Sequence, residues 1–127
     1  MAQVTPQATD RDEYRALARG WGKILATEAF PRGVGSEIDF SRMEELAGEG
    51  AQALVQGMLR EAVWQQGLAL GDRQPCPTCG KDCPLEWRQR TVQTRYGDVE
   101  VPEPHGHCSA CRRDFFPSTV ATSAGRS

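Results

Sequence analysis

Two pairs of cysteines with identical spacing are the residues of this chain that point most directly to chemistry. Cys76 and Cys79 form one C-x-x-C pair, Cys108 and Cys111 form the other, and 28 residues separate the pairs. Two residues between cysteines allow one tight turn to aim both thiolates at a single ion, and two such turns complete a tetrahedral site. The five cysteines are odd in number and no secretion signal opens the chain, which disfavours a disulfide framework. The spacing predicts that these four cysteines bind a structural metal ion.

Zinc is the metal that this pattern favours, because closed tetrahedral thiolate sites in cytoplasmic proteins most often hold zinc without redox duty. A mononuclear iron site is the alternative, since it uses the same four sulfurs. Several aromatic residues near the cysteines resemble the apolar surroundings of iron in a rubredoxin: Trp87, Tyr96, Phe115 and Phe116. We predict structural zinc and keep an iron electron carrier as an alternative function.

Three further residues near the pairs have side chains that bind metals. Cys83 follows the first pair, and we expect it to be a spectator and not a ligand. His105 and His107 precede the second pair, where either one would complete a Cys₃His site. Because four regularly paired cysteines already suffice, we expect both histidines to be loop residues or hydrogen-bond partners of sulfur.

The charges of the chain bear on nucleic-acid binding only through local patches. With 15 basic and 17 acidic residues, the formal net charge is −2 at pH 7. Whole-molecule electrostatics therefore neither attract nor exclude a polyanion. A local basic cluster follows the first cysteine pair: Arg88, Arg90 and Arg95. On an extended strand these side chains would follow a phosphate backbone without reading sequence, so we predict nucleic-acid contact, with a solvated strand face as the alternative.

Two helices are predicted ahead of the cysteines. The first begins at Thr9 or Asp10, follows an amphipathic stripe and ends near Phe30. The second begins at a capping box formed by Ser41 and Glu44, and its apolar series continues to Val63. Small residues along this stripe would allow another helix to approach closely, which indicates a helical hairpin or self-association: Gly48, Gly50, Ala51, Ala53 and Gly57.

Between the cysteine pairs the sequence predicts a β-hairpin. Residues 87–96 read as one strand, Gly97 and Asp98 as the turn, and residues 99–101 as a short return strand that Pro102 ends. The fold class is therefore α+β, with a helical hairpin followed by a small zinc ribbon. We predict a disordered arm over 1–8, a helical region over 9–72, a zinc ribbon over 73–117 and a flexible tail over 118–127.

Composition and length exclude several functional classes. A chain of 127 residues has room for one domain, and no stretch approaches the roughly 18 apolar residues that a membrane helix needs. We expect a cytoplasmic protein without a membrane partner. The chain contains no phosphate-binding glycine loop, no nucleophile with an evident histidine partner and no carboxylate pair suited to acid–base work. We therefore expect that it is not an enzyme.

The order of these motifs resembles the N-terminal region of a bacterial insertion-sequence transposase family of the DDE type. The resemblance covers residues 39–117 and is carried by a helix followed by four short segments: Cys76–Gly80 (CPTCG), Arg90–Val101 (RTVQTRYGDVEV), Cys108–Cys111 (CSAC) and Phe115–Pro117 (FFP). It implies a helical segment and a zinc ribbon that bind DNA ends or assemble the transposase, ahead of an RNase H-like catalytic domain.

The chain departs from the family pattern at two places. After Pro117 it reads STVATS where the family continues into a catalytic region, so the catalytic carboxylates are absent and we expect no DNA cleavage by this chain alone. Residues 101–104 (VPEP) replace a basic, aromatic approach to the second cysteine pair. The predicted partners are DNA, a transposase catalytic subunit or a second copy of the chain through the second helix. The alternative function is a protein-interaction adaptor with structural zinc.

Overall fold

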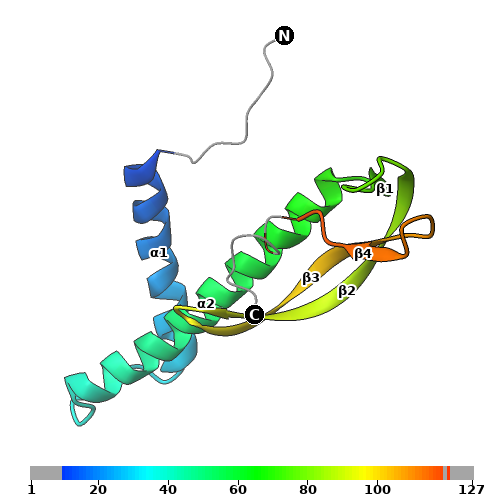
Figure 1. Ribbon diagram of the computed structural model, residues 1–127. Coiled ribbons are helices and arrows are strands. Elements are labelled where there is room, and N and C mark those ends of the chain that lie inside the picture. The colour runs from blue at the N-terminus through cyan, green and yellow to red at the C-terminus, as the bar shows by residue number, and fades with distance from the viewer. Residues whose placement is uncertain (1–9, 119, 121–127) are drawn as a thin grey trace. The chain divides into compact units, whose positions relative to one another are not determined.

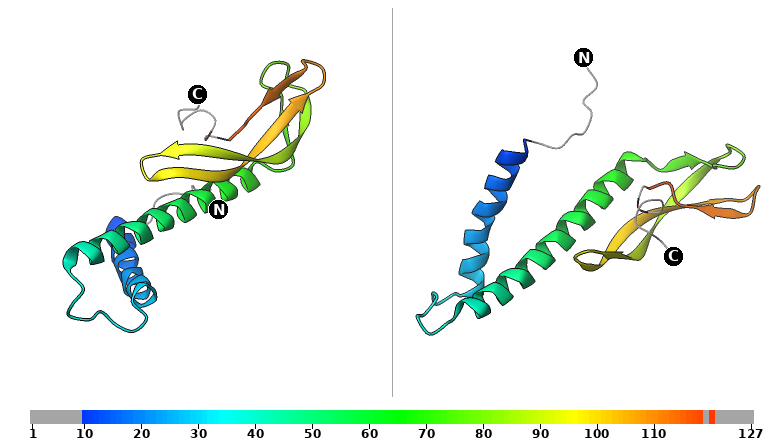
Figure 2. Two further views of the ribbon diagram at one scale, coloured as in Figure 1. Left: turned by 90° about the horizontal axis from the view of Figure 1, so that it is seen from below. Right: turned by 60° about the vertical axis from the view of Figure 1, so that its left-hand side comes forward.

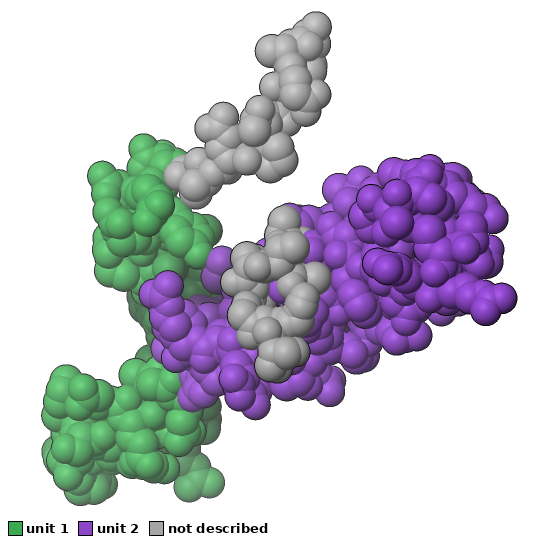
Figure 3. Space-filling model, in the orientation of Figure 1, with its two compact units in different colours: residues 1–50 green, residues 51–127 purple. Residues whose placement is uncertain are grey.

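The computed structural model describes residues 10–118 and 120, and it confirms an α+β fold in which two helices precede an antiparallel sheet (Figure 1). The predicted arm over 1–8 lies outside the described residues. The chain forms two compact units, 1–50 and 51–127, coloured separately in Figure 3. The elements are α1 (Arg11–Ala29), α2 (Phe40–Ala69), β1 (Arg73–Pro75), β2 (Asp82–Thr94), β3 (Gly97–Cys108) and β4 (Arg113–Phe115).

Helix α1 of the first unit begins where the sequence predicts. The Asp10 carboxylate accepts hydrogen bonds from the N–H groups of Asp12 and Glu13, at 2.8 and 3.1 Å. These bonds satisfy backbone donors that the first turn leaves without helical partners. No residue of α1 is buried, and its apolar stripe is exposed, with 63% of Leu17 and 50% of Trp21 accessible to solvent.

Helix α2 begins at Phe40. A cap at Ser41 would have made Arg42 the first helical residue, two positions later. The predicted capping box at Ser41 is wrong, because Asp39 is the residue whose carboxylate accepts from the N–H of Arg42, at 2.9 Å. The helix also continues past Val63 to Ala69. Its second half belongs to the second unit, so the boundary between compact units falls after residue 50, whereas the sequence places the change from helix to ribbon after residue 72.

The sheet has the strand order β1-β2-β3-β4, and every neighbouring pair is antiparallel. Strands β2 and β3 form a long two-stranded ribbon in unbroken register from the pair Leu85–Gly106 to the pair Thr94–Gly97. The turn therefore comprises residues 95 and 96, and the predictions of a turn at Gly97 and Asp98 and of a strand ending at Pro102 are wrong.

The ladder geometry explains why β3 runs through two prolines. The N–H of Leu85 donates to the carbonyl of Asp72 at 2.8 Å, on the side of β2 away from β3. In unbroken antiparallel register, alternate residues share this direction, so the backbone groups of residues opposite Pro102 and Pro104 also point out of the ribbon. The two prolines consequently lack only N–H groups that would not have bonded to β2.

In the second unit the C-terminal half of α2 runs alongside the β2–β3 ribbon, as both views of Figure 2 show. Gly67 lies close to the ribbon: a Cβ atom there would lie against the Trp87 ring and 3.2 Å from Pro104 Cγ. By contrast, Gly48 and Gly57 of the predicted small-residue stripe have no such neighbour within 4 Å. A cluster of valines completes this core: Val92, Val99, Val101 and Val120, with Val63 of α2 packed against them.

The chain stays packed beyond the predicted end of the ribbon at residue 117. Ser118 and Val120 are buried, with 2% and 8% of their surfaces exposed. Ser118 and Val120 of the predicted flexible tail over 118–127 thus contribute to the unit, and the rest of that segment lies outside the described residues.

Candidate metal centre

The first pair of cysteines lies in the tight connection between β1 and β2. The N–H of Cys76 donates to the carbonyl of Lys81, and the N–H of Gly80 donates to the carbonyl of Cys76, each at 2.8 Å. Gly80 has a φ of +79°, a conformation that favours glycine. The N–H of Thr78 also points to Cys76 Sγ, at 3.4 Å. This turn therefore directs backbone dipoles at a sulfur atom.

The second pair lies between β3 and β4 and repeats the same arrangement. The N–H of Cys111 lies 3.4 Å from Cys108 Sγ, and the N–H of Arg112 donates to the carbonyl of Cys108 at 2.7 Å. Arg112 has a φ of 58°, the left-handed conformation that Gly80 adopts in the first turn. Sequence reasoning missed this equivalence because no glycine marks the second turn.

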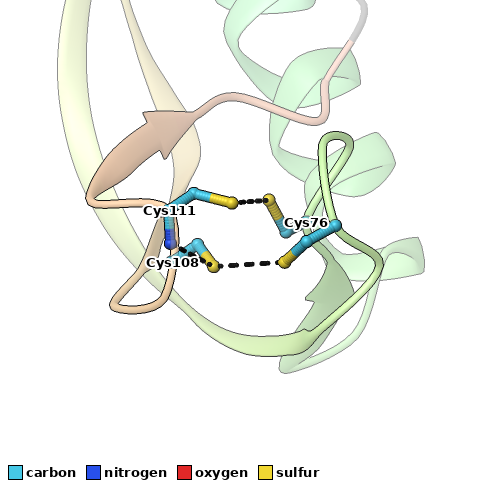
Figure 4. Close-up of side chains that lie close together, drawn as sticks. Cys76, Cys108 and Cys111 are labelled. Carbon is cyan, nitrogen blue, oxygen red and sulfur yellow. Dashed lines mark hydrogen bonds between the residues drawn. The ribbon is translucent and has the colours of Figure 1, made fainter.

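The structure brings together all four cysteines that the sequence predicts as ligands. Their Sγ atoms all lie within 4.8 Å of one another. Across the two turns, Cys76 Sγ is 3.9 Å from Cys111 Sγ and Cys79 Sγ is 3.6 Å from Cys108 Sγ. Figure 4 shows the sulfurs of Cys76 and Cys111 facing each other. For metal–sulfur bonds of about 2.3 Å, a tetrahedron has sulfurs about 3.8 Å apart. The cluster therefore has the size that a tetrahedral metal site requires.

Backbone and side-chain hydrogen bonds give these thiols different acidities. The N–H of Cys111 is the main cause that lowers the pKa of Cys108 to about 6. Backbone N–H groups, first that of Cys79, also lower the pKa of Cys76. The Cys79 side chain, with burial, raises the pKa of Cys111 to about 12. Without metal, some of the four cysteines are therefore thiolates and others are protonated thiols. A metal cation that binds all four sulfurs displaces the remaining protons.

Cys83, the fifth cysteine, packs against the cluster without belonging to it. It is 2% exposed and lies in one apolar group with Cys76, Cys108 and Phe115. Its thiol donates to the carbonyl of Lys81 at 3.2 Å, and burial raises its pKa. A buried, protonated thiol packs as a small apolar side chain, which is consistent with the expectation that Cys83 does not bind the metal.

The two histidines lie on β3, not in a loop, and both face Asp114 rather than sulfur. His107 Nδ1 is 2.6 Å from one carboxylate oxygen, and His105 Nε2 is 3.4 Å from the other. The His107 hydrogen bond is the main cause that lowers the pKa of Asp114. His105 is 5% exposed, makes no hydrogen bond to a described residue through either ring nitrogen, and packs against the Phe116 ring. Sequence reasoning did not identify Asp114 as the partner of the histidines, because only the pairing of β3 with β4 brings it opposite His107.

The three predicted nucleic-acid-binding arginines have different surroundings. Arg90 lies 2.9 Å from the carboxylate of Glu103, in an ion pair that is largely buried. Arg88 and Arg95 are exposed, and among the described residues neither has an ion-pair partner. Two of the three cations are therefore available to a polyanion, while the third is held within the ribbon.

No protein-family model matches the chain, and no curated protein or solved structure matches it either. Within the described residues, neither helix has the combination of length and apolar character that crossing a membrane demands.

Proposed function

We propose that this chain is a non-catalytic zinc-ribbon protein that binds the nucleic-acid backbone, the role implied by its resemblance to a transposase N-terminal region. The observation that carries the proposal is the four-sulfur cluster between two matching turns. Zinc is the ion that closed four-thiolate sites most often hold, and all four positions here are taken by protein. Such a site stabilises a fold and leaves no coordination position for substrate.

The metal stabilises a unit that has little apolar core around the cysteines. That core consists of the cysteines themselves and Phe115, with Leu85 packed against it. Binding free energy at a site of this kind is largely folding free energy, because the unfolded chain has no preformed site. The end of the ribbon at the cysteines therefore depends on the ion.

Phosphate contact is assigned to Arg88 and Arg95, two exposed cations of the ribbon that have no ion-pair partner among the described residues. Guanidinium groups bind phosphate oxygens through several N–H donors, and contact of this kind positions a protein without specifying sequence. Affinity should consequently be salt-dependent and weakly selective for sequence.

The metal is tested by elemental analysis and thiol counting on protein purified anaerobically without added metal. We expect one zinc per chain and four protected cysteines. One iron per chain with a reversible one-electron couple would instead support the electron-carrier alternative, and an absence of metal with all thiols reactive would refute the ribbon.

Nucleic-acid contact is tested by fluorescence anisotropy with a labelled DNA duplex over a series of salt concentrations. A plot of log affinity against log salt concentration has a negative slope. For the double variant Arg88→Gln/Arg95→Gln, we expect this slope to become shallower by about 2, since each lost phosphate contact removes about 0.9 from its magnitude. The control is Arg73→Gln, which removes an exposed arginine already paired with Asp82. An affinity that does not change with salt, or that is equal in both variants, would contradict the proposal and favour a protein-interaction adaptor.

A further inference from the structure

The two long edges of the β2–β3 ribbon differ in how their backbone groups are treated. On β3, the outward positions 102 and 104 are prolines and carry no N–H group. The outward carbonyl of Glu100 accepts a hydrogen bond from the Arg60 guanidinium at 2.9 Å. Further along, Gln56 donates to the carbonyl of Tyr96 at 3.1 Å. The β3 edge is therefore closed to another strand by prolines and by side chains of α2.

Among the described residues, nothing protects the edge of β2 in this way. Beyond the three residues that pair with β1, and beyond Leu85, whose N–H donates to Asp72, its outward N–H and C=O groups belong to Trp87, Gln89, Thr91 and Gln93. No hydrogen bond from a described residue reaches these groups. The strand is continuous there, without proline or bulge, and residues 86–89 are exposed whereas residues 101–106 of β3 are buried. Such an edge can accept a further strand.

We propose that β2 pairs antiparallel with β2 of a second copy of this chain, so that two ribbons join into one sheet about a two-fold axis. An antiparallel edge is complementary to itself, because a two-fold rotation places its outward donors opposite its own acceptors. One exposed strand is then sufficient for a closed dimer, and no other segment is required.

Charge selects the register of this pairing. The three registers with the longest overlap are centred on Gln89, on Arg90 or on Thr91. Centring on Gln89 places Arg88 opposite Arg90 of the second copy, and centring on Arg90 places two Arg90 side chains opposite each other. Like charges directly opposite destabilise a strand pair. Centring on Thr91 avoids both arrangements.

In the register centred on Thr91, the opposite positions are compatible. Gln89 lies opposite Gln93 of the second copy, where two side-chain amides match each other's donors and acceptors. Arg88 lies opposite Thr94 of the second copy, and Arg90 lies opposite Val92 of the second copy. Each outward residue from 89 to 93 thereby gains the backbone partners that it lacks in the single chain.

The association is tested by sedimentation of the full chain loaded with zinc, between about 1 and 200 μM, a range that brackets micromolar dissociation constants. We expect a dimer whose dissociation constant rises at least about tenfold in Thr91→Pro, which removes the central N–H as Pro102 does on β3. The matched control Thr91→Val keeps that N–H and should remain dimeric. A chain that is monomeric at every concentration, or a Thr91→Pro variant that associates as the parent does, overturns the proposal.

Two further variants report the register. Gln89→Lys/Gln93→Lys places lysines opposite each other and should weaken the dimer, while Gln89→Lys/Gln93→Glu places opposite charges there and should restore it. Leu17→Glu, on the exposed stripe of α1, should leave association unchanged. Loss of the dimer in Leu17→Glu with retention in Thr91→Pro would assign association to the helix and overturn the strand pairing.

Amide hydrogen exchange on the unaltered protein gives a test that does not depend on whether a variant folds. The N–H groups of Gln89, Thr91 and Gln93 should exchange more slowly as concentration rises. Those of Arg88, Arg90 and Val92, which face β3, should be protected at every concentration. Equal behaviour of the two sets across concentration would refute the pairing. This proposal does not depend on the identity of the metal or on nucleic-acid binding.

Discussion

The guanidinium of Arg90 lies 2.9 Å from the carboxylate of Glu103, and only 3% of the Glu103 side chain is exposed. The two residues come from neighbouring strands, in which Arg90 is paired with Val101 and Glu103 with Arg88. A carboxylate buried in this way retains its charge because a cation accompanies it. The ribbon therefore contains a buried ion pair at the point where sequence reasoning placed a nucleic-acid contact.

Removing one partner of this pair should destabilise the second unit strongly. Glu103→Ala leaves Arg90 largely buried without a counter-charge, and we expect a loss of about 3 kcal/mol in the free energy of unfolding. This change in the free energy of unfolding is measured by urea unfolding of the metal-loaded protein, with tryptophan fluorescence as the signal. The control is Arg73→Ala, whose exposed pair with Asp82 should contribute less than about 1 kcal/mol. Equal losses in both variants would show that burial does not set the strength of the Arg90 pair.

Metal removal should unfold the ribbon and spare local helix. The apolar group at the cysteines is small, so a metal worth on the order of 10 kcal/mol in such sites accounts for much of the stability. Chelation should abolish the strand signal in circular dichroism and make the cysteine thiols reactive, and zinc should restore the signal. Retention of the sheet after verified removal of metal would contradict this view of the core.

Substitution of Cys79 and of Cys83 should have separable effects. Cys79→Ser removes a predicted ligand, whereas Cys83→Ala shortens a buried side chain that only packs against the cluster. Cobalt-substituted protein provides the measurement, because the intensity of thiolate-to-metal charge transfer reports the number of bound sulfurs. Cys83→Ala should retain the four-sulfur spectrum with a stability loss of about 1 kcal/mol, and Cys79→Ser should lose it. If Cys83→Ala altered the spectrum, the result would show that the Cys83 thiol binds the metal.

Two glycines of α2 offer a matched test of the packing between helix and ribbon. At Gly67 a Cβ atom would meet the Trp87 ring, so Gly67→Ala should destabilise the unit by about 1–3 kcal/mol through overpacking. At Gly57 the space is open, and Gly57→Ala should stabilise the helix by up to about 1 kcal/mol. Thermal unfolding distinguishes them by the sign of the shift in Tm. A gain from Gly67→Ala would mean that the helix does not pack on Trp87 in solution.

Most features that sequence reasoning located correctly depend on residues close together in the chain. Cys76 and Cys79 are aimed by a single turn, and the Asp10 carboxylate reaches only two and three residues along the chain. Interactions of this range are specified by spacing alone. The predicted helix cap at Ser41 failed at the same range, because Asp39 also has a suitable side chain and only the backbone path selects one of the two.

The features that sequence reasoning misplaced depend on contacts between distant segments. A proline ends a strand only where its missing N–H would have bonded to the neighbouring strand, and register decides that for Pro102. Similarly, Arg90 is an exposed cation in a short hairpin but a buried one once β3 extends to carry Glu103. Both outcomes follow from the register and length of the strand pairing, which the local pattern of the hairpin does not encode.

The amino-acid sequence by itself determined the class of this protein: two helices, a ribbon and four thiols spaced for one ion, since each is a matter of local periodicity or spacing. Packing in the folded chain decided which side chains and backbone groups remained available to bind a partner. The approach of α2 to β3 occupied one edge of the ribbon and left the other open, because backbone donors and acceptors are satisfied only by groups that the folded chain brings within hydrogen-bonding distance.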